Sequence, residues 1–141
     1  MKKTKITCLL LVFALAFTVL YSSISQAKTQ DMGAVINAVN LYDVTSDLSI
    51  AGSGSAQIVA TISARVCSST EMTVYLQRKN TVTGNWMTVC SWNKSSRAAT
   101  TSFETTYRVS VKGTYRCKVT GTVTKDGKAE TVHVVSDNVT Y

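Results

Sequence analysis

The stretch Met72–Trp92 alternates apolar and polar residues in two arms, and this pattern constrains the fold more than any other feature of the chain. Successive side chains of a β-strand point to opposite faces of a sheet, so an alternating arm indicates a strand with one buried face. The polar segment Asn80–Asn85 contains a glycine and is typical of a turn. The arms are therefore predicted to form a β-hairpin. The first arm would bury Met72, Val74 and Leu76, and the second would place on one face Trp86, Thr88, Cys90 and Trp92.

Alternation of the same kind continues on both sides of this hairpin. Turn-forming residues at Gly52–Ser55 and Lys125–Lys128 separate the alternating segments. About seven strands without a convincing amphipathic helix predict an all-β fold, an antiparallel β-sandwich. The further strands are predicted at Val39–Val44, Ser46–Ile50, Ala56–Val66, Ala99–Val111, Thr114–Thr124 and Ala129–Tyr141, and Asn93–Arg97 is predicted to be a loop.

The apolar residues of the last predicted strand change phase along its length. Val132 and Val134 occupy even positions, whereas Val139 and Tyr141 occupy odd positions. One extra residue would bring both sets to the same face of the sheet, so a β-bulge is predicted near Ser136–Asn138.

The N-terminal residues have the composition of a secretory signal peptide. Three lysines precede the apolar run Ile6–Leu20, and small residues precede a cleavage site after Ala27. An uncleaved membrane anchor is the alternative, but an apolar run of about 15 residues is shorter than the ~20 that span a bilayer. The sequence therefore predicts a signal peptide at 1–27, an N-terminal lead-in with an edge strand at 28–46, and a β-sandwich domain at 47–141. After cleavage the protein is expected to be secreted, with no membrane association.

The charge of the expected mature chain is moderately positive. Without the three signal-peptide lysines, 12 Lys and Arg stand against 8 Asp and Glu, a net charge of +4. The basic residues are scattered along the sequence, which disfavours nucleic acid as a partner. The charge permits a salt-sensitive attraction to an anionic cell-wall polymer or glycan. We expect a monomer.

Three cysteines remain after cleavage, Cys67, Cys90 and Cys117, an odd number for a secreted chain. If the strand Ala56–Val66 runs upward, Cys67 lies at its upper end. The second hairpin arm also runs upward and places Cys90 near the same end, whereas Cys117 lies early on its own upward strand and therefore lower. We therefore expect a Cys67–Cys90 disulfide, with Cys67–Cys117 as the alternative; Cys90–Cys117 and reduced thiols stay open. No metal site is expected, because the cysteines and the single histidine lack the spacing of metal ligands.

Residues with catalytic chemistry are few. His133 is out of phase with Val132 and Val134 and is predicted to face solvent, whereas Cys117 on the neighbouring strand faces the opposite side. The sequence contains no Gly-x-Ser-x-Gly motif, glycine-rich phosphate loop or pair of carboxylates suited to acid–base catalysis. We expect a protein that is not an enzyme and needs no cofactor.

Aromatic residues of the central hairpin are the candidates for ligand recognition. Trp86 and Trp92 would bind sugar rings if exposed, or cover the two ends of the core; the face that they share with Cys90 favours the core. Tyr75 is out of phase with Val74 and Leu76, so it is expected to be exposed beside Gln77. The candidate binding surface therefore comprises Tyr75, Gln77, Trp86 and Trp92.

The segment Gly113–Cys117, GTYRC, resembles the sixth strand of an immunoglobulin-type domain, where a tyrosine two residues before a cysteine forms the tyrosine corner. The chain departs from antibody domains at Val111, where an aspartate is common, and no tryptophan follows Cys67 as on their third strand. Over Leu48–Tyr141, the order LSI, GSGSA, YLQRK, WMTVCSW, TTYRVSVKGTYR, ETV and SDNVTY is similar to a group of small uncharacterised secreted proteins of clostridia and related Gram-positive bacteria. This resemblance implies an immunoglobulin-like β-sandwich and export, and it implies no catalytic chemistry.

These features together predict a secreted, non-enzymatic binding or structural module at the cell envelope or in the medium. The alternative is an exported effector or inhibitor that acts on other cells.

Overall fold

The computed structural model describes residues 39–141, which contain eight β-strands and no helix. Because this part has no helix, it has none that is long and apolar enough to cross a membrane. The predicted signal peptide at 1–27, its cleavage after Ala27 and the lead-in residues 28–38 lie outside the described residues. The strands are β1 Leu41–Ile50, β2 Ser55–Ala64, β3 Ser69–Lys79, β4 Trp86–Ser96, β5 Thr100–Arg108, β6 Thr114–Lys125, β7 Lys128–Val135 and β8 Val139–Thr140.

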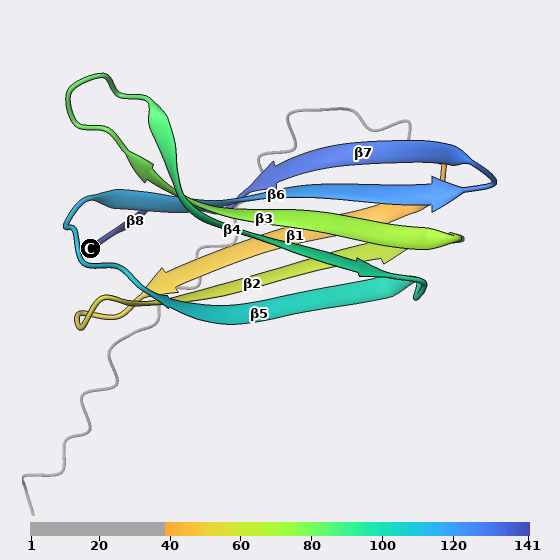
Figure 1. Ribbon diagram of the computed structural model, residues 1–141, viewed down its shortest axis with the longest axis horizontal. Helices are drawn as coiled ribbons and strands as arrows, with labels where there is room; N and C mark the ends of the chain where they lie inside the picture. Colours follow the sequence, from red (N-terminus) through yellow and green to blue (C-terminus); the bar gives the residue numbers. More distant parts are fainter. Residues whose placement is uncertain (1–38) are drawn as a thin grey trace, which may run out of the picture.

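The strands form two antiparallel sheets. One sheet has the order β1-β2-β5, and the other has the order β4-β3-β6-β7, with β8 also pairing with β6. Figure 1 shows that the long strands run along the length of the molecule, with β5 and β7 at opposite margins. The prediction of an all-β, antiparallel fold is confirmed.

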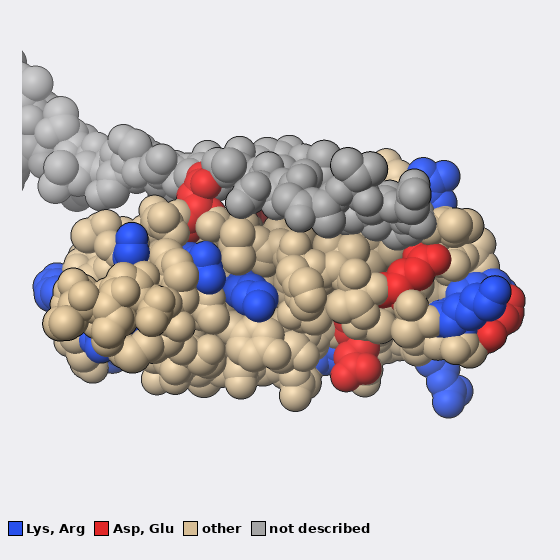
Figure 2. Space-filling view, turned by 90° about the horizontal axis from the view of Figure 1, so that it is seen from above, with Lys and Arg blue, Asp and Glu red and all other residues tan. Residues whose placement is uncertain are grey.

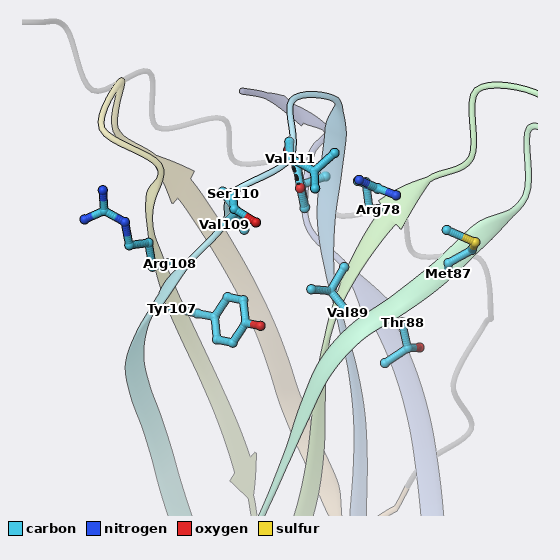
Figure 3. A pocket seen from close by; sticks show the side chains of 10 residues that line it. Arg78, Met87, Thr88, Val89, Tyr107, Arg108, Val109, Ser110 and Val111 are labelled. Atoms are coloured by element: carbon cyan, nitrogen blue, oxygen red, sulfur yellow. Dashed lines mark hydrogen bonds between the residues drawn. The ribbon is translucent and has the colours of Figure 1, made fainter.

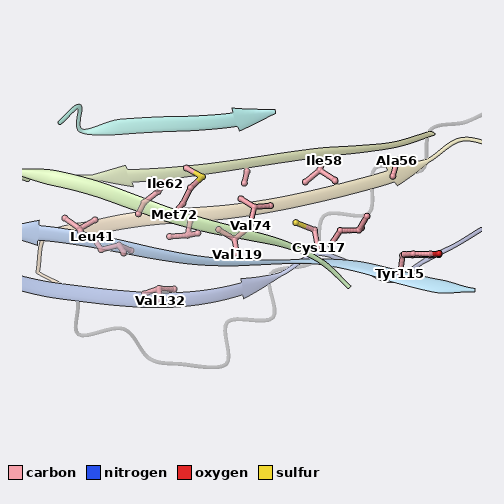
Figure 4. Close-up of a cluster of buried hydrophobic side chains, with 14 of the residues drawn as sticks. Leu41, Ala56, Ile58, Ile62, Met72, Val74, Tyr115, Cys117, Val119 and Val132 are labelled. Atoms are coloured by element: carbon pink, nitrogen blue, oxygen red, sulfur yellow. The ribbon is translucent and has the colours of Figure 1, made fainter. Parts of the chain in front are cut away.

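The core lies between the two sheets and is formed by alternate residues of β2, β3 and β6 (Figure 4). Burying each of these large apolar side chains stabilises the fold by roughly 1.5–3 kcal/mol. The inward phase predicted for Met72, Val74 and Leu76 is confirmed. The strand predicted at Ala56–Val66 ends at Ala64, and Val66 is exposed. The fully buried residues include Ile58, Ile62, Met72, Val74, Leu76, Cys117, Val119 and Val123.

The predicted turns between strands are present. Asp126 and Gly127 connect β6 to β7 with φ angles of 49° and 75°, which is the left-handed geometry of a two-residue hairpin turn. Between β1 and β2, Gly54 has a φ of 83°, and a Cβ atom there would lie 2.5 Å from the carbonyl oxygen of Val109. Glycine is therefore required at position 54 by both backbone conformation and space.

The predicted extra residue near Ser136 is also confirmed. Lys118 pairs with Val135 and Tyr115 pairs with Val139, so three steps along β6 correspond to four steps along the last segment. Ser136 satisfies the hydrogen bonds at this irregularity. Its N–H donates to the carbonyl of Cys117 at 2.8 Å, and its Oγ accepts from the N–H of Cys117 at 2.8 Å.

Several strand boundaries differ from the prediction: the strand predicted at Ala99–Val111 ends at Arg108, and the last predicted strand is divided into β7 and β8. Two further differences concern β1 and β4. The segments Val39–Val44 and Ser46–Ile50 belong to one strand, β1, which crosses the predicted domain boundary at residue 46 and has an irregular register between Leu41 and Asp43. β4 continues through the predicted loop as far as Ser96, because β3 offers backbone partners along its whole length. Polar residues are tolerated there because β4 is an edge strand open to water.

Glu130 on β7 holds the start of β1, in an arrangement that we call the Glu130 clamp. Its Oε2 accepts from the N–H groups of Asn40 and Leu41, both at 2.9 Å, and its Oε1 accepts from the N–H of Val39 at 3.2 Å and from Nδ2 of Asn40 at 2.9 Å. These donors, first among them the N–H of Leu41, favour the ionised carboxylate and lower the pKa of Glu130. The clamp links the first strand of one sheet to the last long strand of the other.

Candidate ligand-binding surface

A β-bulge at Val89 divides β4 into two parts that face opposite ways. Leu76 pairs with Cys90, and the next residue of β3, Gln77, pairs with Thr88, so Val89 has no partner on β3. An extra residue in one strand reverses the phase of all side chains beyond it. Cys90 therefore lies on the core face opposite Leu76, whereas Thr88 lies on the outer face of the sheet.

Trp92 lies on the core side of the bulge, opposite Val74. Its ring packs against two aromatic rings of β5, with centroid distances of 5.9 Å to Phe103 and 6.0 Å to Tyr107. Aromatic pairs at such distances stabilise a fold by ~0.5–1.5 kcal/mol beyond the area that they bury. Trp92 thus closes the side of the core between the edge strands of the two sheets.

Trp86 lies on the outer face, opposite Lys79. The expectation that Trp86 and Trp92 share one face is wrong, because the bulge at Val89 stands between them. The guanidinium carbon of Arg116 on β6 is 4.1 Å from the centre of the Trp86 ring, which is a cation–π contact.

Gln77 on β3 fixes this guanidinium in place. Its Oε1 accepts a hydrogen bond from Nε of Arg116 at 2.9 Å. Partial burial lowers the pKa of Arg116, but a guanidinium stays charged at neutral pH. Nε is committed to the amide, so the terminal amino groups of Arg116 are the donors that a ligand could engage.

The next row of the outer face adds an aromatic ring and a cation. Tyr75 pairs with Lys118 across β3 and β6, just as Gln77 pairs with Arg116 one row away. Each of these side chains is exposed or half-buried. We refer to these outward-facing residues as the outer-face cluster: Tyr75, Gln77, Lys79, Trp86, Arg116 and Lys118.

The strands of the outer-face cluster carry one acidic residue, Glu71. It is four residues from Tyr75, the nearest member of the cluster, roughly 13 Å along β3. Figure 2 shows Lys and Arg side chains at both ends of the visible face, with Asp and Glu side chains between and beside them. The basic residues are thus dispersed singly over this face, without a continuous patch.

The structure brings together three of the four predicted binding residues: Tyr75, Gln77 and Trp86. Trp92 is separated from them by the sheet. The prediction of the binding surface lacked Arg116 and Lys118, although alternation along β6 already indicates that they point outward. The missing information was that β6 pairs with β3, which places both cations beside the aromatic residues.

The expected disulfide is absent, because Cys67, Cys90 and Cys117 are all free thiols. Cys90 and Cys117 flank Leu76 from its two sides, so they are two strand spacings or ~10 Å apart, beyond the ~7 Å between Cα atoms that a disulfide can bridge. Cys67 precedes β3 by two residues, and it is therefore roughly 30 Å along the strand direction from the row of Leu76. This register rules out both the Cys67–Cys90 pair and the Cys67–Cys117 alternative.

The orientations predicted for His133 and Cys117 are confirmed. His133 is exposed, with Nδ1 2.9 Å from Oγ1 of Thr120, whereas Cys117 is fully buried on the opposite face of the sheet. Burial raises the pKa of the Cys117 thiol to about 11. The two residues cannot form a catalytic Cys–His pair. Over residues 39–141, no three or more His, Cys, Asp and Glu side chains gather where they could hold a metal ion.

The geometry of the outer-face cluster is that of a small binding surface: an arginine held over a tryptophan by an amide, with a tyrosine and two lysines beside it. No protein-family model matches the chain, and comparisons with curated proteins and with solved structures give no match.

Proposed function

We propose that this protein is a secreted, non-enzymatic module with an immunoglobulin-like β-sandwich fold, and that its outer-face cluster binds an anionic polymer or glycan of the cell envelope. The observation that carries the proposal is the contact of Arg116 with Trp86 and Gln77. A cation and an aromatic ring are held in place on an open sheet face before any ligand arrives. Such preorganisation reduces the entropy that binding costs.

The order of the strands supports the immunoglobulin-like fold. A sheet β1-β2-β5 facing a sheet β4-β3-β6-β7 has the order A-B-E and C′-C-F-G of that fold. The hydroxyl of Tyr115 donates to the carbonyl of Val111, four residues upstream. This is the hydrogen bond of a tyrosine corner, and it occurs at the GTYRC segment that resembles the sixth strand of such domains.

The chemistry of the cluster suits a ligand that carries negative charges and sugar rings. Arg116 and Lys118 are alternate residues of one strand, about 7 Å apart, so they can engage neighbouring anionic groups of a repeating polymer. The exposed parts of Trp86 and Tyr75 offer apolar faces with polar edges, which suit a sugar ring.

A direct test compares two double variants that lose the same charge. Arg116→Gln with Lys118→Gln removes the two cations of the cluster, whereas Lys125→Gln with Lys128→Gln removes two lysines at the distant β6–β7 turn. Each protein is bound to isolated Gram-positive cell walls and eluted with increasing salt. We expect the cluster variant to bind roughly thirtyfold more weakly and to elute at lower salt, because cations near an anionic surface each contribute ~1 kcal/mol.

The control variant defines what would refute the proposal. Equal weakening of both variants would mean that net charge alone causes retention, and wall binding that ignores salt would exclude an anionic ligand. If fractionated cells released all of the protein to the medium and it affected neighbouring cells, the exported effector would become the better proposal.

A further inference from the structure

A pocket of about 280 Å³ lies where β5 and the segment after it face β4. Its lining includes Met87 and Val89 of β4, Tyr107 of β5, and Val111. Figure 3 shows Tyr107 and Val89 directed towards each other across this opening. Sites that enclose a drug-sized ligand usually measure ~300–1,000 Å³, so this pocket suits a single large apolar side chain.

Exposed apolar side chains gather at this pocket beside polar and charged ones. Seven large hydrophobic residues of the described part are exposed, and three of them, Met87, Val89 and Val111, line this one pocket at 41%, 39% and 51% exposure. Apolar side chains that gather at one exposed place indicate an interaction site, whereas single exposed ones do not. The bulge contributes directly, because it brings Val89 to the opening.

The strand beside the pocket has an unpaired edge within the described residues. β5 pairs with β2 in a regular ladder over nine residues and forms the outer margin of its sheet, as Figure 1 shows. Such an edge presents free N–H and C=O groups to an extended chain. β4 is also an edge strand, but its bulge breaks the regular spacing of these groups. Proline, which often blocks edge strands, is absent from the sequence.

The charge around the pocket indicates the nature of the partner. Arg78 and Arg108 both belong to the lining, and neither forms an ion pair with a carboxylate of the described residues. Figure 3 places Arg78 beside the opening and turns the guanidinium of Arg108 to the other side of β5. Glu104 lies on the same face of β5 as Arg108, so an acidic residue is favoured at the end of the strand beside the pocket, where Arg78 and Arg108 lie, and not at the middle of the strand.

We propose that an extended acidic peptide segment of another protein adds to the edge of β5 and places one large apolar side chain in this pocket. The main-chain hydrogen bonds supply affinity, and the pocket with its two arginines selects the sequence. This site is separate from the outer-face cluster, and the proposal does not depend on the proposed function.

The test uses a blocked nine-residue peptide of alternating glutamate and valine with a central leucine, titrated into the protein and followed by amide and methyl NMR shifts. Binding is expected to shift the amides of β5 and the methyl groups of Met87, Val89 and Val111. Two further peptides carry N-methyl groups at either set of alternate residues. If the peptide pairs with β5 as a strand, N-methylation of the residues whose N–H groups face β5 must abolish binding, whereas N-methylation of the other set must not. A peptide with lysine in place of each glutamate must bind at least tenfold more weakly.

A matched pair of protein variants tests the position of the site. Val111→Glu places a carboxylate in the pocket and is expected to weaken peptide binding at least tenfold, while Val82→Glu makes the same change on the exposed β3–β4 loop and is expected to bind normally. Both positions are exposed, so both variants should fold, which their melting temperatures will verify. The proposal is wrong if millimolar peptide shifts no β5 amide resonance, or if neither N-methylated peptide loses affinity. It is also wrong if the lysine peptide binds as tightly as the glutamate peptide, or if Val111→Glu and Val82→Glu bind the peptide with the same affinity. Dimerisation through β5 would also overturn it in favour of a second copy.

Discussion

Trp86 and Trp92 are six residues apart on one strand, yet they serve different parts of the molecule. Trp92 packs inward against Phe103 and Tyr107, at the boundary between the two sheets. Trp86 faces outward beneath the guanidinium of Arg116. A regular strand would place both residues on one face. The single unpaired residue Val89 therefore decides that one tryptophan contributes to stability and the other to the surface.

The largest effect is expected from Trp92→Ala. Removing a large ring at the edge of the core should lower the free energy of unfolding by about 2–3 kcal/mol, somewhat less than for a fully buried tryptophan. Urea unfolding followed by circular dichroism measures this loss. Wall binding of the folded fraction should be unchanged. A loss no greater than that of Trp86→Ala would contradict the division between the two residues.

Deleting Val89 should abolish the difference between the two tryptophans. Without the extra residue, Trp86 and Thr88 must either turn inward or lose their pairing with β3, at a cost of roughly 1–2 kcal/mol. We expect faster hydrogen exchange at the amides of Arg78 and Lys79 and elution from cell walls at a lower salt concentration. Deleting Val82 from the β3–β4 loop is the control, and it should leave the contact of Trp86 with Arg116 intact.

Trp86→Ala should have a smaller effect on stability and a larger effect on binding. The lost cation–π contact is worth about 0.5–1 kcal/mol at an exposed site. The salt concentration that elutes the protein from walls should fall, and Trp86→Phe should restore part of it because a smaller ring remains under Arg116. Unchanged elution of Trp86→Ala would remove this tryptophan from the binding surface.

At neutral pH the smallest effect concerns Cys117, which lies in the same row of the sheet as Cys90. Its folded pKa of about 11 lies above its ordinary value of 9.0, so the folded state retains a proton that the unfolded chain releases. Stability should therefore decline by up to about 1.4 kcal/mol per pH unit as the pH rises from 9.0 towards 11, and the Cys117→Val variant should lose this part of the decline. Half-buried Cys90 should react with a thiol reagent in the folded protein, and Cys117 should react only after unfolding. Equal reaction rates would mean that the inner face opens readily.

The strand phases of the core could be predicted because each of β2, β3 and β6 has apolar residues in one phase. The segment Trp86–Trp92 is different, because apolar residues occupy both phases: Met87 and Val89 at odd positions, and Trp86, Cys90 and Trp92 at even positions. That mixed pattern is the available signal of a bulge, but it does not identify the unpaired residue. The position depends on the register with β3, which the backbone hydrogen bonds determine.

The cysteines and one buried polar pair show the same dependence on long-range register. The strand directions predicted correctly that Cys67 lies at one end of the sheet. They did not predict that Cys90 and Cys117 both lie beside Leu76, far from Cys67 and on opposite sides of β3. Thr70 and Thr101 look like surface residues in the sequence, yet both are buried and their hydroxyl oxygens lie 2.7 Å apart, joining β3 to β5. A hydroxyl can be buried at little cost when another hydroxyl is its partner, and the sequence does not show which residue that is.

The Glu130 clamp has a consequence for how the module would carry a mechanical load. The start of β1 and the C-terminus lie at opposite ends of the long axis, so tension applied through the two ends of the described chain acts along the strands (Figure 1). Tension applied at the start of β1 loads the hydrogen bonds of the Glu130 carboxylate before it loads the hydrogen bonds between β1 and β2. Because ladder hydrogen bonds lie perpendicular to the strands, such a pull shears many of them at once instead of opening them singly. A module built in this way would stretch little under a steady pull, and protonation of one carboxylate would remove its first point of resistance.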